Sequence, residues 1–346
     1  GSRAVGDDPA DLVLAERKLL FRGEGKLDWV ARGSLTSHQG TWVFVYSHGA
    51  THAHRPPQVM RIRFSTDEGR TWSEADHLPD GTPVDGAPFT ALNPKNEISE
   101  GIVLTCPNGD LLVHARENDN RHWFGTRQFR SMDGGRSWRD EGVLLGQAEM
   151  RTCLHHTVSG DTLYLPLMHQ QSTRIGSPAS VELFTSTDHG KTWQRTGRIA
   201  ERSDEVNESG VVHLGGDTLI SVHRTRGERN TLLGRSDDRG RTWAPLVDIG
   251  PEVGAVQQPR LRRFEDEPGR LYLLGRDRIE EYDQRNAVWY SDDEGQTWKQ
   301  IALDEKLFRD TGYVDALKRQ DGTLYCLAYR GTDEQADLWE YLLRRP

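Results

Sequence analysis

Short runs of alternating apolar and polar residues recur along the chain, each of them placed directly after a tight-turn sequence. The runs are residues 38–47 (HQGTWVFVYS), 108–116 (NGDLLVHAR), 159–168 (SGDTLYLPLM), 216–224 (GDTLISVHR), 267–276 (EPGRLYLLGR) and 321–329 (DGTLYCLAY). A hydrophobic period of two, bounded by Gly, Asp and Asn, predicts β-strands joined by tight turns. The pattern therefore predicts six repeated β units with little helix.

A second motif, S-x-D-x-G-x-[ST]-W, follows five of these runs. It occupies residues 65–72, 131–138, 186–193, 236–243 and 291–298, and its Asp residues are spaced by 66, 55, 50 and 55 positions. Asp and Gly favour a tight turn, because the Asp side chain bonds nearby backbone N–H groups and Gly tolerates positive φ. The Trp gives each turn a large apolar body to bury between neighbouring units. The five copies are therefore predicted to be structural turns of a repeat protein.

Each unit has room for about four short strands, which is the size of a propeller blade. The last unit lacks the turn motif and ends in LWEYLL, residues 338–343. The segment LVLAERKLLF, residues 12–21, is free to add the outermost strand there and to close the ring, which removes exposed sheet edges. We therefore expect an all-β, six-bladed β-propeller with five Asp-box turns, formed by residues 12–346 as one domain. Residues 1–11 are expected to be a flexible N-terminus that begins with a cloning remnant, Gly1-Ser2.

Composition narrows the choice of partners. The 346 residues are 35% hydrophobic, with a net charge of −9 and a pI near 5.8. This acidic balance argues against nucleic-acid binding and against binding to anionic membranes. No apolar run approaches the roughly 18 residues of a transmembrane helix, so no membrane insertion is expected. The three cysteines lie in strand-like runs and are expected to be buried without disulfides. We expect a secreted or periplasmic protein whose leader has been removed, and no cofactor.

Charged residues are predicted near the axis of the ring. The first strand of a blade begins near the axis, and the second strand ends at the same face of the ring. The residue eleven positions before each strand leucine and the residue five positions after it should therefore lie close together, as a pair sixteen positions apart. The pairs are Glu100/Arg116, Thr152/Met168, Glu208/Arg224, Arg260/Arg276 and Tyr313/Tyr329, and Trp42 gives Ala31/Ser47 with Arg32 next to it. Charged groups where a structural core would be apolar favour a ligand site. Inter-blade ion pairs are the alternative, above all for Arg116 and Arg276.

These segments resemble the sialidase superfamily over nearly the whole chain. The resemblance rests on the five turn motifs, NESGVVHLGGDTLISVHR (207–224), RNAVWYSDDEGQTW (285–298) and TGYVDALKRQDGTLYCLAY (311–329). It implies a pocket in which Arg224, Arg285 and one of Arg260 or Arg276 converge near the axis and bind the carboxylate of an acidic sugar through bidentate hydrogen bonds, with Arg32 as a further binding residue. It further implies that Tyr313 is the nucleophile and that Glu208 is its base, since sialidases use Tyr where other glycosidases use a carboxylate. Arg32 lies in WVARGSL (29–35), one position out of the family register.

The family's acid/base Asp has no counterpart in the matching loop, residues 46–58 (YSHGATHAHRPPQ), which contains no acidic residue. Its histidines suggest that His52 or His54 transfers the proton, because histidine does so at neutral pH. A solvated surface loop is the alternative. No metal site is expected, since the histidines lack a helix or an acidic partner. The run TCLHH, residues 152–156, places His155 near the mouth of the third unit as a further binding residue.

Three functions remain open. The first is a sialidase-like exo-glycoside hydrolase that removes a terminal acidic sugar, either a sialic acid or another ulosonic or uronic acid, from an acidic glycan. The second is a polysaccharide lyase or uronate-linked glycosidase that uses His and Tyr beside a carboxylate neutralised by Arg. The third is a non-catalytic carbohydrate-binding propeller, which holds sugar with Trp and Arg and does not turn it over.

Overall fold

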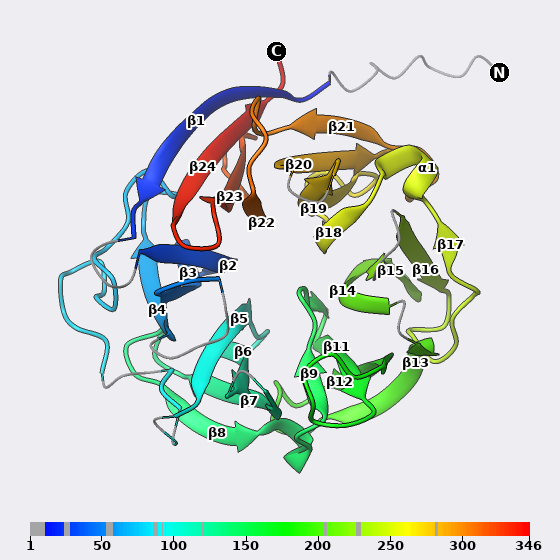
Figure 1. Cartoon of the computed structure of the whole chain (residues 1–346), viewed down its shortest axis with the longest axis horizontal. Helices are drawn as coiled ribbons and strands as arrows, with labels where there is room; N and C mark the ends of the chain where they lie inside the picture. Colours follow the sequence, from blue (N-terminus) through cyan, green and yellow to red (C-terminus); the bar gives the residue numbers. More distant parts are fainter. Residues whose placement is uncertain are drawn as a thin grey trace.

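The protein is a β-propeller, whose sheets are set around a central axis (Figure 1). The computed structural model describes residues 11–23, 28–52, 58–85, 89–91, 93, 95–119, 121–203, 206–225, 230–280 and 283–346. Within these residues, helix is limited to η1 (Leu144–Gly146) and α1 (Gly250–Val253). The predicted all-β propeller is therefore confirmed. No helix in the described part of the chain has the length and apolar character needed to cross a membrane.

Four separate sheets form successive blades from the middle of the chain. The first contains β5 (Glu97–Thr105), β6 (Leu111–Asn118), β7 (Trp123–Ser131) and β8 (Arg139–Val143). The second contains β9 (Met150–Thr152), β10 (Thr157–Ser159), β11 (Thr162–Gln170), β12 (Ala179–Ser186) and β13 (Gln194–Ser203). The third contains β14 (Val206–Gly215), β15 (Thr218–Thr225), β16 (Thr231–Ser236) and β17 (Val247–Asp248). The fourth contains β18 (Val256–Arg262), β19 (Leu271–Arg278), β20 (Gln284–Ser291) and β21 (Lys299–Ala302).

The two ends of the chain share a fifth, seven-stranded sheet. It contains β1 (Val13–Phe21), β2 (Trp29–His38), β3 (Thr41–Gly49), β4 (Gln58–Ser65), β22 (Asp310–Lys318), β23 (Leu324–Gly331) and β24 (Ala336–Arg344). The sequence predicted a six-bladed ring, whereas the described strands form four separate blades and this one joined sheet. The physical reason is a single parallel contact, Trp29 with Ala336, where the start of β2 meets the start of β24.

The N-terminal strand closes the outer edge of the joined sheet, as the sequence predicted. Strand β1 pairs antiparallel with β24, from Val13 opposite Arg344 to Phe21 opposite Leu338. In Figure 1, β1 lies outside β24, on the side away from the axis. The hydrogen-bonding edge of β24 is thereby covered by a strand from the other end of the chain.

The five S-x-D-x-G-x-[ST]-W segments adopt one hydrogen-bonded turn. In the first copy, Ser65 Oγ donates to Asp67 Oδ1 over 2.8 Å and accepts from the Gly69 amide over 2.8 Å. Thr71 donates from its amide to Oδ1 and from its hydroxyl to Oδ2 of the same Asp, over 2.8 and 2.6 Å. The same bonds recur around Asp133, Asp188, Asp238 and Asp293. These Asp carboxylates are consequently engaged by their own turns and are structural.

The motif tryptophans join neighbouring units. Trp72 packs against the cluster that contains Phe44 and Tyr325, and its indole N–H donates to the Tyr325 hydroxyl over 3.1 Å. Trp193 donates likewise to Gln128 Oε1 in the preceding blade over 3.0 Å. The cores are otherwise formed by the inward residues of the strands, and Cys106, Cys153 and Cys326 are buried and unbridged, as expected.

Candidate active site

Backbone bulges on the innermost strands aim side chains at the axis. Pairing between first and second strands breaks between Ala31 and Ser34, Ser99 and Ile102, Gln257 and Arg260, and Gly312 and Asp315. Each break contains one non-glycine residue with positive φ: Arg32 (55°), Glu100 (53°), Gln258 (48°) and Tyr313 (51°). Such conformations cost about 1–3 kcal/mol each and gather at functional sites. Four such bulges lie around one axis and therefore mark a candidate site.

The bulges explain where counting along the sequence failed. Leu111 pairs with Thr105 and Leu324 pairs with Lys318, so each leucine lies opposite the residue six positions before it. In these two blades, counting eleven positions back from the leucine correctly gave the bulge residues Glu100 and Tyr313. The turn between β2 and β3 is one residue shorter, with Trp42 opposite Ser37, so the bulge residue is Arg32 and not Ala31. The turn between β18 and β19 is two residues longer, since Tyr272 lies opposite Arg262. The bulge residue of that blade is therefore Gln258, which the sequence analysis missed.

The Tyr313 hydroxyl lies between two carboxylates. It is 3.0 Å from Glu100 Oε1 and 3.4 Å from Glu208 Oε1, and all three side chains are buried. Burial raises the pKa of Tyr313, and the charge of Glu208 raises it further, whereas Arg32 and Arg116 act in the opposite direction. The resting tyrosine is therefore a neutral phenol that donates its one proton. The expected meeting of Tyr313 and Glu208 across the axis is observed.

Glu208 is held as an anion. Its Oε2 accepts from Arg224 Nη1 over 2.7 Å and from the Gln258 amide over 3.2 Å. Burial alone would raise the pKa of this carboxyl, but the charge and hydrogen bond of Arg224, with the charges of Arg116 and Arg276, lower it to about 2. Glu208 and Arg224 thus form the pair that the sixteen-residue spacing predicted.

Glu100 is held by arginines of two sheets. Its Oε2 is in close contact with Arg116 Nη1, and its Oε1 is 3.5 Å from Arg32 Nε. Arg116 also donates from Nη2 to the Thr152 carbonyl of the next blade over 2.8 Å. Burial lowers the pKa of Arg116 to about 9. Arg116 is therefore ion-paired within its own blade, hydrogen-bonded to the next blade, and a neighbour of the Tyr313 site.

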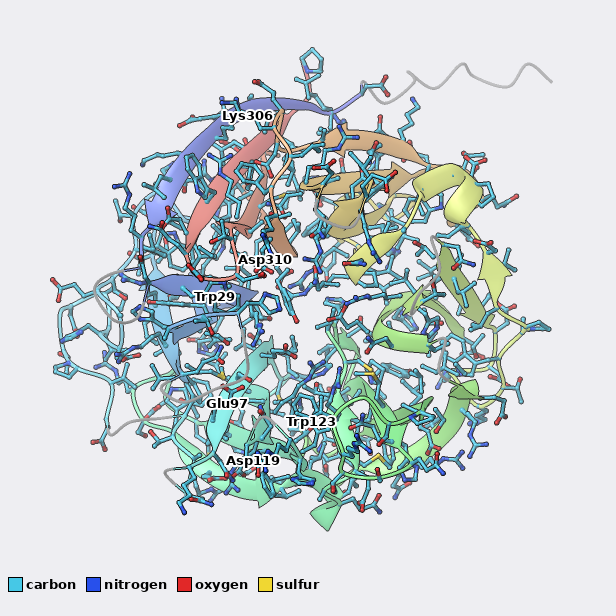
Figure 2. The ribbon with its side chains drawn as sticks, viewed as in Figure 1. Trp29, Glu97, Asp119, Trp123, Lys306 and Asp310 are labelled. Atoms are coloured by element: carbon cyan, nitrogen blue, oxygen red, sulfur yellow. The ribbon has the colours of Figure 1, made fainter. Side chains whose placement is uncertain are left out.

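His52 is oriented by an acidic residue from the far end of the chain. Its Nδ1 lies 2.6 Å from Asp310 Oδ2, and Asp310 Oδ1 accepts from Tyr329 over 2.7 Å and from Arg276 over 3.2 Å. Burial alone would raise the pKa of Asp310, but the hydrogen bond and charge of His52 and the charge of Arg276 lower it. In Figure 2, Asp310 lies close to the axis, whereas Lys306 lies at the outer rim. The sequence analysis found no acidic partner for this histidine because Asp310 is remote in sequence.

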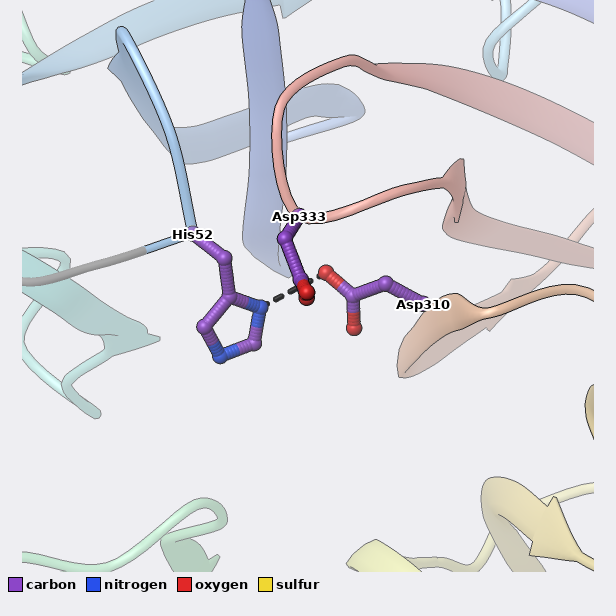
Figure 3. A group of neighbouring side chains, drawn as sticks. All are labelled: His52, Asp310 and Asp333. Carbon is purple, nitrogen blue, oxygen red and sulfur yellow. Dashed lines mark hydrogen bonds and ion pairs between the residues drawn. The ribbon is translucent and has the colours of Figure 1, made fainter. Parts of the chain in front are cut away.

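One three-residue group at this mouth has the ligand types of a metal site. His52, Asp310 and Asp333 each offer one ligand atom, and these atoms lie within 4.8 Å of one another (Figure 3). His52 and Asp310 already share a hydrogen bond, and Asp333 is exposed and lies 3.5 Å from Arg309 Nε. Two of the three groups, His52 and Asp310, are therefore already joined to each other by a hydrogen bond.

Trp29 forms one wall beside this pair. The Arg32 guanidinium lies over its ring at 4.7 Å, and the His52 ring meets it edge-on at 5.3 Å. Arg32 also donates from Nη2 to the His52 carbonyl over 2.6 Å. The bulge at Arg32 therefore positions the histidine loop as well as the arginine.

Three predicted binding residues lie outside this cluster. Arg260 is fully buried and paired with Asp315 Oδ2 at 2.7 Å. Arg285 binds Asp277 at 3.0 Å and Gln300 at 3.4 Å, toward the outer strand β21. His155 is buried with Nδ1 3.1 Å from the Val211 carbonyl, and burial lowers its pKa to about 3. His54 lies outside the described residues.

Arg151 on β9 was missed by one position, since the count selected its neighbour Thr152. Its guanidinium lies over the Trp123 ring at 4.6 Å, and its charge acts on Arg116. Burial lowers the pKa of Arg151, while Glu208 and Tyr313 oppose that shift. An arginine next to a predicted mouth position was the only signal available in the sequence.

Positive charge exceeds negative charge around Tyr313. The described groups of the cluster are the arginines Arg32, Arg116, Arg151, Arg224 and Arg276 and the carboxylates Glu100, Glu208 and Asp310. The Nε atoms of Arg224 and Arg276 are buried and have no hydrogen-bond partner among the described residues. Buried donors are nearly always satisfied. These two buried donors are therefore available to an acceptor that enters the site.

Comparison with known proteins agrees with this architecture. Residues 91–326 match the family described as BNR repeat-like domain, so the chain belongs to that family. A comparison with curated protein sequences finds no match.

Solved structures resemble the fold at low sequence identity. A protein of unknown function from Dyadobacter fermentans has a TM-score of 0.76 and 17% identity, covering 97% of this chain and 99% of its own. The Trypanosoma rangeli sialidase has a TM-score of 0.71 and 16% identity, covering 94% of this chain. The NanB sialidase from Streptococcus pneumoniae has a TM-score of 0.65 and 11% identity, covering 97% of this chain and 70% of its own. The chain spans 59% of the length of the Trypanosoma rangeli sialidase.

Proposed function

We propose that this protein is an exo-acting glycoside hydrolase that removes a terminal acidic sugar, a sialic acid or another ulosonic or uronic acid, from a glycan. One observation carries the proposal: a buried tyrosine hydroxyl lies against two carboxylates and is surrounded by arginines. A carboxylate nucleophile would be repelled by the carboxylate that an ulosonic acid carries on its anomeric carbon, whereas a neutral phenol is not. The sialidases among the similar folds support the same reaction class.

The arginines bind the substrate carboxylate. Arg224 and Arg276 have unpartnered Nε donors among the described residues, and Arg32 contacts the His52 carbonyl and acts on Tyr313 through its charge. Guanidinium groups bind a carboxylate bidentately and fix its orientation. The anomeric carbon, which is bonded to that carboxylate, is thereby held next to the Tyr313 oxygen. Holding the two atoms in this geometry accounts for a large share of the barrier reduction.

Tyr313 then attacks. Its proton passes to an adjacent carboxylate, its oxygen bonds to the anomeric carbon, and the bond from that carbon to the leaving oxygen breaks. His52 gives a proton to the leaving oxygen as general acid. Nδ1 of His52 faces Asp310, so its other ring nitrogen points away from that carboxylate (Figure 3).

Water completes the cycle. His52, now neutral, takes a proton from a water molecule whose oxygen bonds to the anomeric carbon as the bond to Tyr313 breaks. The phenolate recovers its proton from the carboxylate. Two displacements at one carbon return the original anomeric configuration.

The number of units around the axis and the extent of the domain are also proposed. We propose that the seven-stranded sheet comprises two units, β2–β4 and β22–β24 with β1, so that six units surround the axis, and that residues 12–346 form one domain. The bulges of β2 and β22 support this division, because each unit then contributes one inner strand to the site.

Product analysis tests the function. The protein is incubated with aryl ketosides of several ulosonic acids, aryl uronides and acidic polysaccharides, and products are followed by NMR and mass spectrometry. Release of a free ulosonic acid, formed first in the configuration of the substrate, is expected. An unsaturated uronate would instead identify a lyase, and sugar binding without turnover would identify a binding propeller.

A further inference from the structure

The phenolic proton of Tyr313 has two acceptors, and the nearer one is not Glu208. The Tyr313 oxygen is 3.0 Å from Glu100 Oε1 and 3.4 Å from Glu208 Oε1. A phenol has one proton to donate, and hydrogen bonds between oxygens are strongest at about 2.5–3.0 Å. The hydrogen bond of the resting site is therefore directed at Glu100.

Glu100 and Glu208 also differ in their other hydrogen-bond partners. Glu208 uses Oε2 to bind Arg224 and the Gln258 amide, and this binding lowers its pKa to about 2. Because the Arg224 guanidinium is itself assigned to the substrate, Glu208 is well suited to position that arginine.

Glu100 is fixed so that one oxygen faces the phenol. The residue stands on a bulge with φ of 53°, and its amide donates to Ser47 Oγ over 3.2 Å. Arg116 holds Oε2, which leaves Oε1 toward Tyr313, with Arg32 Nε 3.5 Å away. A residue held in a strained conformation by two sheets is typical of a functional position.

We propose that Glu100 is a catalytic residue that accepts the proton of Tyr313 as its oxygen bonds to the anomeric carbon, while Glu208 chiefly positions Arg224. This inference rests on the proposed function. The proton moves from the Tyr313 oxygen to Glu100 Oε1 during glycosylation and returns when water releases the sugar, so the step is balanced without a further reactant.

Covalent labelling of Tyr313 measures this step directly. A 2,3-difluoro ulosonic acid forms a slowly hydrolysed bond to the nucleophile, and the labelling rate is read from the intact mass with peptide mapping to Tyr313. Glu100→Gln should slow labelling by a factor on the order of 10² or more. Glu117→Gln is the matched control, because Glu117 is a buried carboxylate of the same blade that pairs with Arg127, and it should label at the parent rate.

The outcomes separate the two proposals. Labelling of Tyr313 in the parent with an unchanged rate in Glu100→Gln would overturn the role of Glu100 and leave the hydrolase standing. Absence of both turnover and labelling in the parent would overturn the proposed function itself. If Glu100→Gln does not fold, Glu100→Asp retracts the carboxylate by one methylene and keeps its charge, and it should fold and label more slowly. A parent rate in Glu100→Asp would contradict the proposal.

Discussion

The imidazole of His52 and the carboxylate of Asp310 are separated by 258 positions in the chain and by 2.6 Å in the fold. The loop that carries His52 contains no acid, and the acid comes from the first residue of β22. The acidic partner of His52 therefore comes from a different segment of the chain. A histidine changes charge between pH 5 and 8, so it can act as both acid and base near neutral pH.

The first prediction concerns Asp310→Asn. The change keeps the shape of the side chain but removes the negative charge that faces the imidazole and weakens the hydrogen bond that orients it. We expect kcat to fall by about 10-fold or more, because a group that transfers a proton is no longer held in place. Steady-state kinetics measure this effect, and a parental kcat in the variant would remove His52 from proton transfer.

The second prediction contrasts two arginines. Arg224→Lys keeps the charge but loses the planar fork, so kcat/KM for an acidic ketoside should fall by about 10-fold or more. Arg285→Lys is the control, because Arg285 binds Asp277 and Gln300 away from Tyr313. It should leave kcat/KM nearly unchanged. Equal losses in the two variants would contradict the position assigned to the substrate carboxylate.

The third prediction concerns a structural turn. Asp188 accepts from Ser186, Lys191 and Thr192, so Asp188→Ala should lower the free energy of unfolding by about 1–2 kcal/mol without altering turnover. Burial opposes ionisation, but the hydrogen bonds of Thr192 and Ser186 lower the pKa of Asp188 to about 2. A carboxyl whose pKa is lower in the folded chain than in the unfolded chain stabilises the fold at pH values above its unfolded pKa, near 3.9. That stabilisation is lost as the pH falls toward 2. In urea unfolding, the difference in the free energy of unfolding between parent and variant should therefore decrease as the pH is lowered from about 4 to about 2. A difference that does not depend on pH would contradict the account.

Much of the fold was predictable because its signals are local. The alternating runs mark the second strands, the motif marks the turns, and the pairing of β1 with β24 followed from the absence of a sixth motif. The joining of β2 to β24 was not predictable, because it depends on one parallel contact between Trp29 and Ala336.

The site was predictable only where the turn between first and second strands has the common length. Glu100 and Tyr313 were found in this way, whereas Arg260 was chosen in place of Gln258 because the turn of that blade is two residues longer. Asp310 was missed for a different reason. Its partner lies in another part of the chain, and no local pattern records such a contact.

The central claim is that Tyr313 is the nucleophile, and turnover by Tyr313→Phe tests it most directly. The change removes one oxygen and leaves the packing of the ring in place, so the circular dichroism spectrum should match that of the parent. kcat for an aryl ketoside of an ulosonic acid that the parent hydrolyses should fall by a factor on the order of 10² or more, because the attacking oxygen is lost. Parental kcat in the folded Phe variant would contradict the account and move the chemistry to another site.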